Sequence, residues 1–229
     1  KSWEEYLWSR SLTMRAIHAI WASVPSSTLG VMGAAPAPPA SSAAPDGKPT
    51  EQKTNMPDLV FTRRFSMGHR LIHGASESCA LPHGHNEFIT VRLKPTSPSR
   101  LDGSANMPVS FQKAKQTWHR FVDERLDHAL QLAGDDPLLA WFKTHEPTRA
   151  ARIVVTPGDP TTELMTCLLM AKINAFLVAE GGVLYCSELS IEETPTNTVS
   201  FAGDPADFIP NTDIGQAYWW NRADMSIAD

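Results

Sequence analysis

Cysteine is scarce in this chain of 229 residues, which contains only Cys79, Cys167 and Cys186. Three cysteines are too few for a disulfide framework, and an odd number suits a reducing compartment. We therefore expect a cytoplasmic protein, with an organellar location as the alternative. The alternative comes from the segment "MRAIHAIWASV" at Met14, where Arg among apolar residues is typical of a transit peptide. A plain amphipathic helix has the same pattern, and it is the interpretation that we favour.

The chain also lacks an excess of positive charge. It has 20 Lys and Arg residues against 25 Asp and Glu, which gives a formal net charge of −5. This balance argues against a nucleic-acid-binding protein that neutralises many phosphates. No apolar run approaches the roughly 20 residues that a membrane-spanning helix needs. The composition, 42% hydrophobic and 20% charged, is that of a globular domain, and it suits a small-molecule enzyme and a protein-binding module equally.

Four segments of different composition divide the chain. Residues 1–24 predict an amphipathic helix whose tryptophans need a partner surface, either on the chain's own domain or on another subunit. Residues 25–56 are rich in Pro, Ala and Ser, which is typical of an extended linker. Residues 57–202 contain the regular patterns of a folded domain. Residues 203–229 are a tryptophan-rich tail without regular periodicity.

Within residues 57–202, strand patterns and helix patterns follow one another along the chain. Partial alternation of β-branched and aromatic residues predicts strands, and apolar residues at helical spacing predict helices. The predicted strands are 58–66, 88–95, 151–157, 183–193 and 198–203, and the predicted helices are 111–126 and 159–182. This order predicts an α+β domain in which helices cover one face of a mostly antiparallel sheet.

The stretch "GHRLIHGASESCALPHGHNEF", residues 68–88, holds four histidines and one cysteine. A single glycine separates His83 from His85, and in a strand the side chains of residues two apart point to the same side. His69 ends the preceding predicted strand, so a third imidazole can lie beside them. Three histidines with an open fourth position are the pattern of a catalytic zinc site. Surface histidines also occur in such pairs by chance, and we expect His73 to be loop surface.

Cys79 lies four residues before His83, in a predicted loop. A thiol beside a metal ion and imidazoles ionises readily, and its thiolate can abstract a proton or attack a carbonyl. The alternative is a small buried apolar side chain, which is the commoner fate of an isolated cysteine. Cys167 and Cys186 fall inside predicted core elements, where the apolar interpretation holds for both.

Two more groups can supply chemistry. Asp127 precedes His128 in "ERLDHAL", and a carboxylate can orient an imidazole and stabilise its cation. Adjacent side chains on a helix do not face each other, so the pair needs a turn, and a solvated helix end is the alternative. Glu192 and Glu193 end a predicted strand and point to opposite sides, so one of them can face a cleft. There it can accept two hydrogen bonds from an amino-pyrimidinone ring; the alternative is a solvated pair.

Together these motifs resemble those of the 6-pyruvoyl-tetrahydropterin synthase and 6-carboxy-tetrahydropterin synthase superfamily. The resemblance covers residues 57–202 and is carried in order by "FSMGHRL", "CALPHGHNEF", "ERLDHAL", "DPTTELM" and "LSIEETPTN". It implies the tunnelling fold, in which two helices pack on one face of a four-stranded antiparallel sheet. It also implies a homo-oligomer, either a trimer or a hexamer, with the active site between subunits.

The resemblance also implies a role for each matched position. Three residues match the zinc ligands, namely His69, His83 and His85. Cys79 matches the catalytic thiol, and Asp127 and His128 match the pair that completes the catalytic set. Glu193 matches the carboxylate that anchors the pterin ring. Position alone suggests Arg70 as a contact for the triphosphate of the substrate.

The spacing of Cys79 from the histidines resembles that of the bacterial 6-carboxy-tetrahydropterin synthases of the queuosine pathway. It implies a zinc-dependent lyase that acts on 7,8-dihydroneopterin triphosphate. Alternatives are the 6-pyruvoyl-tetrahydropterin synthase reaction, a branch with Glu in place of the cysteine (Glu77 lies nearby), a pterin-binding protein, and a scaffold subunit that docks through residues 1–56. Two residues depart from the superfamily pattern, since Glu87 and Ser110 stand where an aromatic residue and Asp are common.

Overall fold

The computed structural model describes residues 56–74, 76–97, 100–210 and 217–229. The helix expected at residues 1–24 and the expected linker up to residue 55 lie outside these ranges, so both stay predictions. The elements that follow belong to the expected domain and to the tryptophan-rich tail.

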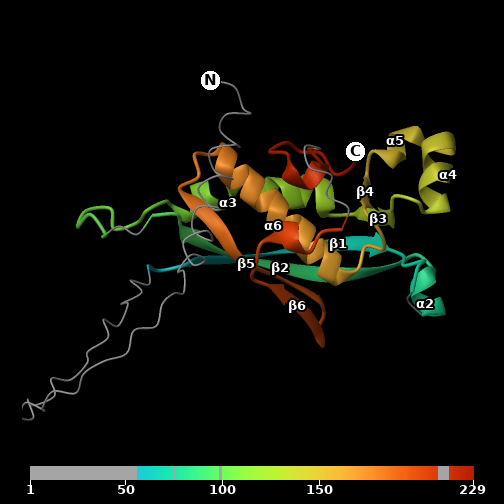
Figure 1. Cartoon of the computed structure of the whole chain (residues 1–229), viewed down its shortest axis with the longest axis horizontal. Coiled ribbons are helices and arrows are strands. Elements are labelled where there is room, and N and C mark those ends of the chain that lie inside the picture. Colours follow the sequence, from blue (N-terminus) through green and yellow to red (C-terminus); the bar gives the residue numbers. More distant parts are fainter. Residues whose placement is uncertain (1–55, 75, 98–99, 211–216) are drawn as a thin grey trace, which may run out of the picture. The chain divides into compact units, whose positions relative to one another are not determined.

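Among the described residues, six strands form one sheet (Figure 1). They lie in the order β4-β3-β1-β2-β5-β6. The strands are β1 (Leu59–His69), β2 (His83–Pro95), β3 (Ala129–Ala133), β4 (Ile153–Thr156), β5 (Leu184–Thr194) and β6 (Asn197–Phe201). β1, β2, β5 and β6 pair antiparallel in that order, whereas β3 pairs in parallel with both β1 and β4. The sheet is therefore mixed.

The sheet differs from the expected four-stranded antiparallel sheet because two short strands extend it in parallel. The sequence does not predict β3, since "ALQLA" has no β-branched residue and follows a helical pattern without a break. The helix before it ends in a π-helical turn, η2 (Val122–Leu126). The chain then turns at His128, whose φ of 59° lies in the left-handed region. This turn places β3 beside β1.

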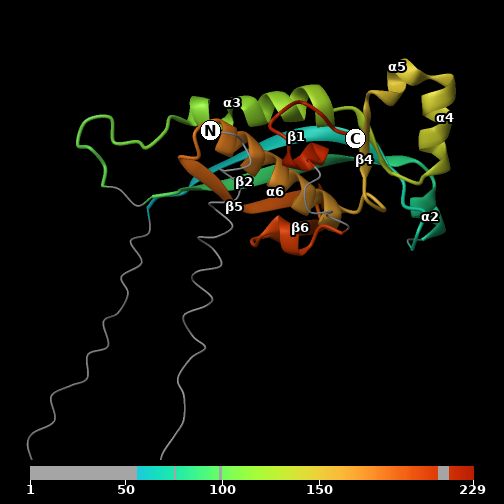
Figure 2. The ribbon, with the colours of Figure 1, turned by 45° about the horizontal axis from the view of Figure 1, so that its top comes forward.

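Two helices cover the same face of the sheet, α3 (Phe111–Phe121) and α6 (Thr162–Ala179) (Figure 2). Each begins after a hydroxyl side chain, Ser110 or Thr161, that accepts a hydrogen bond from a free backbone N–H of the first turn. Both helices share one buried apolar cluster with the sheet. Its large members include Phe65, Ile89, Trp118, Phe121, Leu168 and Phe176. The structure thus has the expected two helices on one face.

Two unpredicted helices, α4 (Pro137–His145) and α5 (Pro147–Ala150), connect β3 to β4. A further short helix, α2 (Glu77–Ala80), lies in the connection between β1 and β2. Asp136 starts α4 by accepting a hydrogen bond from the backbone N–H of Leu138. These connections stand at the edge of the sheet where β1, β3 and β4 end.

Among the described residues, α6 is the one helix that is long and apolar enough to cross a membrane by length and composition. Its apolar side chains have another explanation, because 61% of the segment is buried inside the domain. A helix that is hydrophobic on all sides is typical of the core of a globular domain as well as of a membrane span. The burial of α6 therefore accounts for its composition.

The tryptophan-rich tail packs against α6 and β4. Trp219 is fully buried, and its indole N–H donates to the Val155 carbonyl oxygen at 2.8 Å. Lys172 of α6 is also fully buried, and its ammonium donates to the carbonyl oxygens of Trp219 and Arg222, both at 2.8 Å. Burial lowers the pKa of Lys172 to about 8, while Asp224 counteracts the shift. The tail thus completes the core through contacts that its own sequence pattern does not reveal.

Candidate functional site

Three imidazoles come together on the helix-covered face of the sheet. His69 ends β1, and His83 and His85 begin β2, where His69 pairs directly with His83. The ring centroids of the three histidines lie 4.6 Å, 5.1 Å and 5.1 Å apart. One nitrogen atom from each ring can be chosen so that all three lie within 4.8 Å of one another. This spacing allows all three to coordinate a single ion.

Glycine between the two histidines of β2 permits this approach. A Cβ atom added at Gly84 would clash with the carbonyl oxygen of Met67 on β1. Gly84 pairs with Gly68 in the antiparallel ladder. Because neither residue has a side chain, β1 and β2 stay close where His69, His83 and His85 must converge.

Backbone carbonyls orient two of the imidazoles. The Nδ1 atom of His69 lies 3.2 Å from the Pro160 carbonyl oxygen, and Nδ1 of His83 lies 2.9 Å from that of Leu81. A carbonyl only accepts hydrogen bonds, so each Nδ1 carries the hydrogen and each Nε2 is a free electron-pair donor. The two Nε2 atoms nevertheless face each other at 3.1 Å. A shared cation would satisfy both.

The electrostatics of His69 agree with a neutral, metal-binding imidazole. Its side chain is buried, and this burial is the largest effect that lowers its pKa. The neighbouring His83 and His85 lower the pKa further, while the Pro160 carbonyl and Glu193 oppose the shift. Neutral imidazoles are ligands for zinc, copper, iron and nickel. The donor set therefore fits a transition-metal ion.

Two carboxyl groups lie beside the imidazoles on the same face of the sheet. Since Phe88 pairs with Glu192, the next residues toward the site, Glu87 and Glu193, are cross-strand neighbours. Glu87 is buried, and this burial together with the Glu193 carboxylate raises the pKa of Glu87 to about 8. Glu193 is half-buried, and its Oε1 accepts a hydrogen bond from the Thr162 hydroxyl at 2.8 Å. The site thus has a neutral acid beside a carboxylate.

Cys79 lies on α2, in the connection that joins His69 to His83. Its thiol is partly exposed and accepts a hydrogen bond from the Ser76 hydroxyl at 3.2 Å. Its carbonyl oxygen accepts from the backbone N–H of Leu71 at 2.8 Å, which holds α2 against the end of β1. The thiol is therefore accessible, and among the described residues it does not belong to the group of possible metal ligands.

Asp127 and His128 form the predicted pair. Asp127 Oδ2 lies 2.8 Å from Nδ1 of His128, in the turn that ends the helix. Asp127 Oδ1 accepts from the Ser66 backbone N–H at 2.8 Å, and this bond is the main cause that lowers the pKa of Asp127. The His128 side chain is 78% exposed. Within the described residues no hydrogen bond joins it to His69, His83 or His85.

Arg70 is already paired. Its guanidinium binds the Asp136 carboxylate through two hydrogen bonds, one of them from Nε at 2.7 Å. The Asp136 side chain is fully buried, so the pair also anchors the start of α4. An arginine in a two-bond pair with a buried carboxylate is less available for a phosphate group. The suggestion that Arg70 contacts the triphosphate therefore receives no support from this geometry.

Comparison with known proteins finds the same superfamily. The 6-pyruvoyl tetrahydropterin synthase family matches residues 58–204. The chain is 29% identical over 139 residues to the 6-carboxy-5,6,7,8-tetrahydropterin synthase of Rickettsia felis, covering 60% of this chain and 95% of that one. It is also 29% identical to a probable 6-carboxy-5,6,7,8-tetrahydropterin synthase of Halobacterium salinarum, over 59% of this chain and 79% of the relative.

Among solved structures, the chain is similar to that of an uncharacterized protein from Wolinella succinogenes. The TM-score is 0.51 at 22% sequence identity, and the match covers 64% of this chain and 98% of that one. At this identity the similarity supports the fold alone. The curated relatives carry the information about activity.

Proposed function

Since the chain belongs to the 6-pyruvoyl tetrahydropterin synthase family, we propose that it is a zinc-dependent lyase acting on 7,8-dihydroneopterin triphosphate. With one water consumed, the products would be 6-carboxy-5,6,7,8-tetrahydropterin, acetaldehyde and triphosphate. The choice of the carboxy product follows the names of the curated relatives in Rickettsia felis and Halobacterium salinarum. The observation that carries the proposal is the convergence of three imidazoles inside the matched region.

The metal position in this proposal belongs to His69, His83 and His85. These three residues would hold a zinc ion, which would supply Lewis-acid chemistry that makes the side-chain hydroxyl groups of the substrate more acidic. The carbonyls of Pro160 and Leu81 hold two of the rings with Nε2 free. Three protein ligands leave one position open, as in other catalytic zinc sites.

The remaining roles fall to side chains around the imidazoles. Cys79, as a thiolate, moves protons at the side-chain carbons of the substrate. Glu193 accepts hydrogen bonds from the pterin ring and keeps the reacting carbons in place. Thr162 supports this role, because its hydroxyl already fixes one carboxylate oxygen of Glu193.

The acid–base pair of Asp127 and His128 comes from a second copy of the chain in this proposal. The motivation is the exposure of His128, whose ring points to solvent while Asp127 holds it. A homo-oligomer that brings this edge to the imidazoles of a neighbouring subunit would complete the site. His128 then acts as the acid or base complementary to Cys79, and Asp127 orients it.

Product analysis tests the proposed reaction. Purified full-length protein loaded with zinc is incubated with 7,8-dihydroneopterin triphosphate, and the products are separated by chromatography and identified by mass. We expect 6-carboxy-5,6,7,8-tetrahydropterin, with acetaldehyde and triphosphate released in equal amounts. A 6-pyruvoyl product would replace the carboxy assignment by the pyruvoyl one. Binding of the substrate without formation of any product would show that the protein is a pterin-binding module and not an enzyme.

A further inference from the structure

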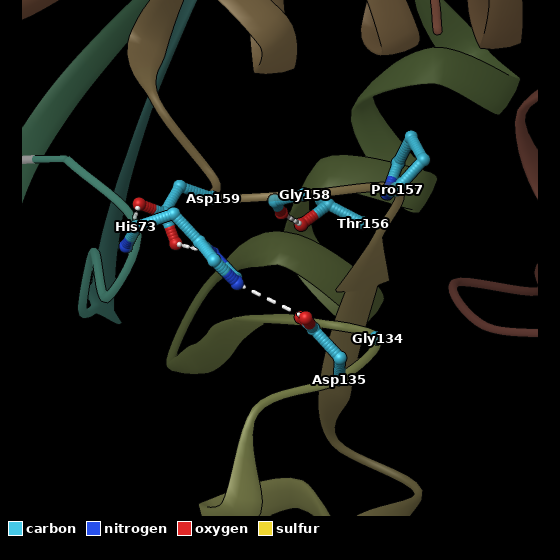
Figure 3. A pocket seen from close by; sticks show the side chains of 7 residues that line it. All are labelled: His73, Gly134, Asp135, Thr156, Pro157, Gly158 and Asp159. Atoms are coloured by element: carbon cyan, nitrogen blue, oxygen red, sulfur yellow. Dashed lines mark hydrogen bonds and ion pairs between the residues drawn. The ribbon is translucent and has the colours of Figure 1, made fainter. Parts of the chain in front are cut away.

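His73 lies at the edge of the sheet where three connections meet. β1, β3 and β4 run in parallel, so their carboxyl ends share one edge. His73 belongs to the connection after β1, Asp135 to the one after β3, and Asp159 to the one between β4 and α6. Figure 3 shows the His73 ring between the two carboxylates. All three residues line a hollow of about 400 Å³. We call these three residues the His73 cluster.

The geometry of the cluster requires a cationic ring. Nδ1 of His73 lies 2.9 Å from Oδ1 of Asp159, and Nε2 lies 3.0 Å from Oδ2 of Asp135. An ionised carboxylate only accepts hydrogen bonds, so both ring nitrogens must carry hydrogen, which makes the ring an imidazolium. Asp159 and Asp135 also raise the pKa of His73, in that order of strength. These two carboxylates are the charged groups that face His73 among the described residues.

Asp159 connects the cluster to the candidate site. Its carboxylate also accepts from the backbone N–H groups of Ile72 at 2.9 Å and His73 at 2.7 Å. The next residue, Pro160, is the one whose carbonyl orients His69. On the other side of the cluster, Leu71 donates its N–H to the carbonyl of Cys79. Residues 71–73 thus contact the backbone of Cys79 through Leu71, and they contact Asp159, the residue before Pro160, through the N–H groups of Ile72 and His73.

We propose that His73 is a positioning residue. Its ring joins Asp135 to Asp159, and it thereby holds the helix that carries Cys79 against the connection whose Pro160 carbonyl orients His69. We call this helix, α2 (Glu77–Ala80), the Cys79 segment. The importance of His73 for turnover rests on the proposed function. Its effect on the Cys79 segment does not, because that effect depends only on contacts within the fold. The cluster itself touches neither the substrate nor the metal in this proposal.

The sign of the pH dependence follows from the raised pKa. The unfolded histidine has a pKa of about 6.5, and the folded value is higher. The contribution of the cluster is therefore complete below about pH 6.5 and is lost as the pH rises through the folded value. The Cys79 segment should loosen over the same range.

Alkylation of Cys79 tests the proposal without requiring catalysis. The full-length protein is treated with iodoacetamide, and labelling at each cysteine is followed by mass spectrometry; Cys167 and Cys186 are buried and serve as internal references. His73→Gln removes the cation, while His73→Arg keeps a cation that can bridge two carboxylates at every pH. His145→Gln is the matched control, since His145 is an exposed histidine on α4 outside the cluster.

At about pH 6, we expect Cys79 to react roughly fivefold faster in His73→Gln than in the wild type, because the segment opens more often. At a pH above the folded pKa of His73 the two rates should be equal, because the wild-type ring is then neutral. His73→Arg should stay slow at both pH values, and His145→Gln should match the wild type. Asp135→Asn removes the charge of one of the two carboxylates that bind His73. We expect it to speed the labelling of Cys79 at about pH 6, but less than His73→Gln does.

Equal Cys79 labelling in wild type and His73→Gln at about pH 6 would overturn the proposal, as would a failure of His73→Arg to restore the slow rate. For turnover of 7,8-dihydroneopterin triphosphate, we expect His73→Gln to lower kcat with little change in KM. If neither the wild type nor any variant shows turnover, the proposed function is wrong. The labelling rates of Cys79 still decide the role of His73.

Discussion

The two chemical regions of this domain are built in opposite ways. The three imidazoles stand on neighbouring strands, and His69 among them is buried and held by a backbone carbonyl. The pair of Asp127 and His128 lies in the turn between η2 and β3, where the His128 ring is mostly exposed. A pair of strands can fix the positions of side chains to within about an ångström, which is the precision that a shared ion needs. An exposed turn, by contrast, can present a side chain to another molecule. The three imidazoles converge within one chain, whereas the proposed function takes the Asp127 and His128 pair from a neighbouring subunit.

The largest expected effect comes from breaking the group of three imidazoles. His83→Ala removes one of the three proposed ligands and leaves His69 without the Nε2 partner at 3.1 Å. We expect bound zinc to fall from about one per chain to near zero, with loss of measurable turnover, because two imidazoles hold zinc poorly. Elemental analysis of dialysed protein measures the metal. His145→Ala is the control, and unchanged zinc in His83→Ala would rule out the ligand assignment.

The next effect separates the thiol from the metal. Cys79→Ala should lower turnover by about a thousandfold, since it removes a group that transfers protons. Zinc content should stay at the wild-type level, because Cys79 is not among the ligand atoms that converge. Cys167→Ala, a change in the apolar core, is the control and should keep turnover. Full activity of Cys79→Ala would exclude the catalytic role.

A smaller effect is expected from the exposed pair. Asp127→Asn keeps the shape but weakens the orientation of His128, so turnover should fall about a hundredfold while zinc stays bound. The pKa of Asp127 is lowered in the fold, chiefly by the Ser66 N–H. The stability that this carboxylate contributes is therefore present above about pH 4 and is lost as the pH falls through its folded pKa. Urea unfolding at about pH 7 and pH 3 should show a larger loss of stability in the variant at the higher pH.

The smallest signal comes from mixing two inactive variants. If the exposed pair serves a neighbouring subunit, then refolding His83→Ala together with His128→Ala should create some sites with an intact half from each chain. A part of the wild-type turnover should return in the mixture, while each variant refolded alone stays inactive. No recovery, at a subunit exchange verified by mass, would mean that each chain supplies its own pair.

The sequence predicts the convergence of His69, His83 and His85 because the alternation of side chains along a strand is a local property, and the two strands follow one another in the chain. It also predicts the helices that carry Trp118 and Phe176, since their apolar spacing is local too. Strand periodicity places Glu87, two residues after His85 in β2, on the same face as the imidazoles. Its charge nevertheless favours a solvent-exposed position, and the sequence does not show that the register of β2 and β5 brings Glu193 beside it.

Other features depend on contacts between distant parts of the chain. β3 forms because the turn at His128 brings a short segment against β1, and its own composition favours no strand. Lys172 can be buried because carbonyls 47 and 50 positions away in the tail accept from it. The placement of Asp127 beside Ser66 arises in the same way, across 61 positions. No periodicity within a single segment contains that information.

The most direct test of the metal-centred reaction is a zinc titration of metal-free protein, with turnover of 7,8-dihydroneopterin triphosphate followed at each step. If the imidazoles of His69, His83 and His85 hold the ion that the reaction needs, formation of 6-carboxy-5,6,7,8-tetrahydropterin should rise linearly and level off near one zinc per chain. His83→Ala should stay inactive throughout the titration. Product formation at full rate in the metal-free protein, or a rise that His83→Ala reproduces, would contradict the proposal.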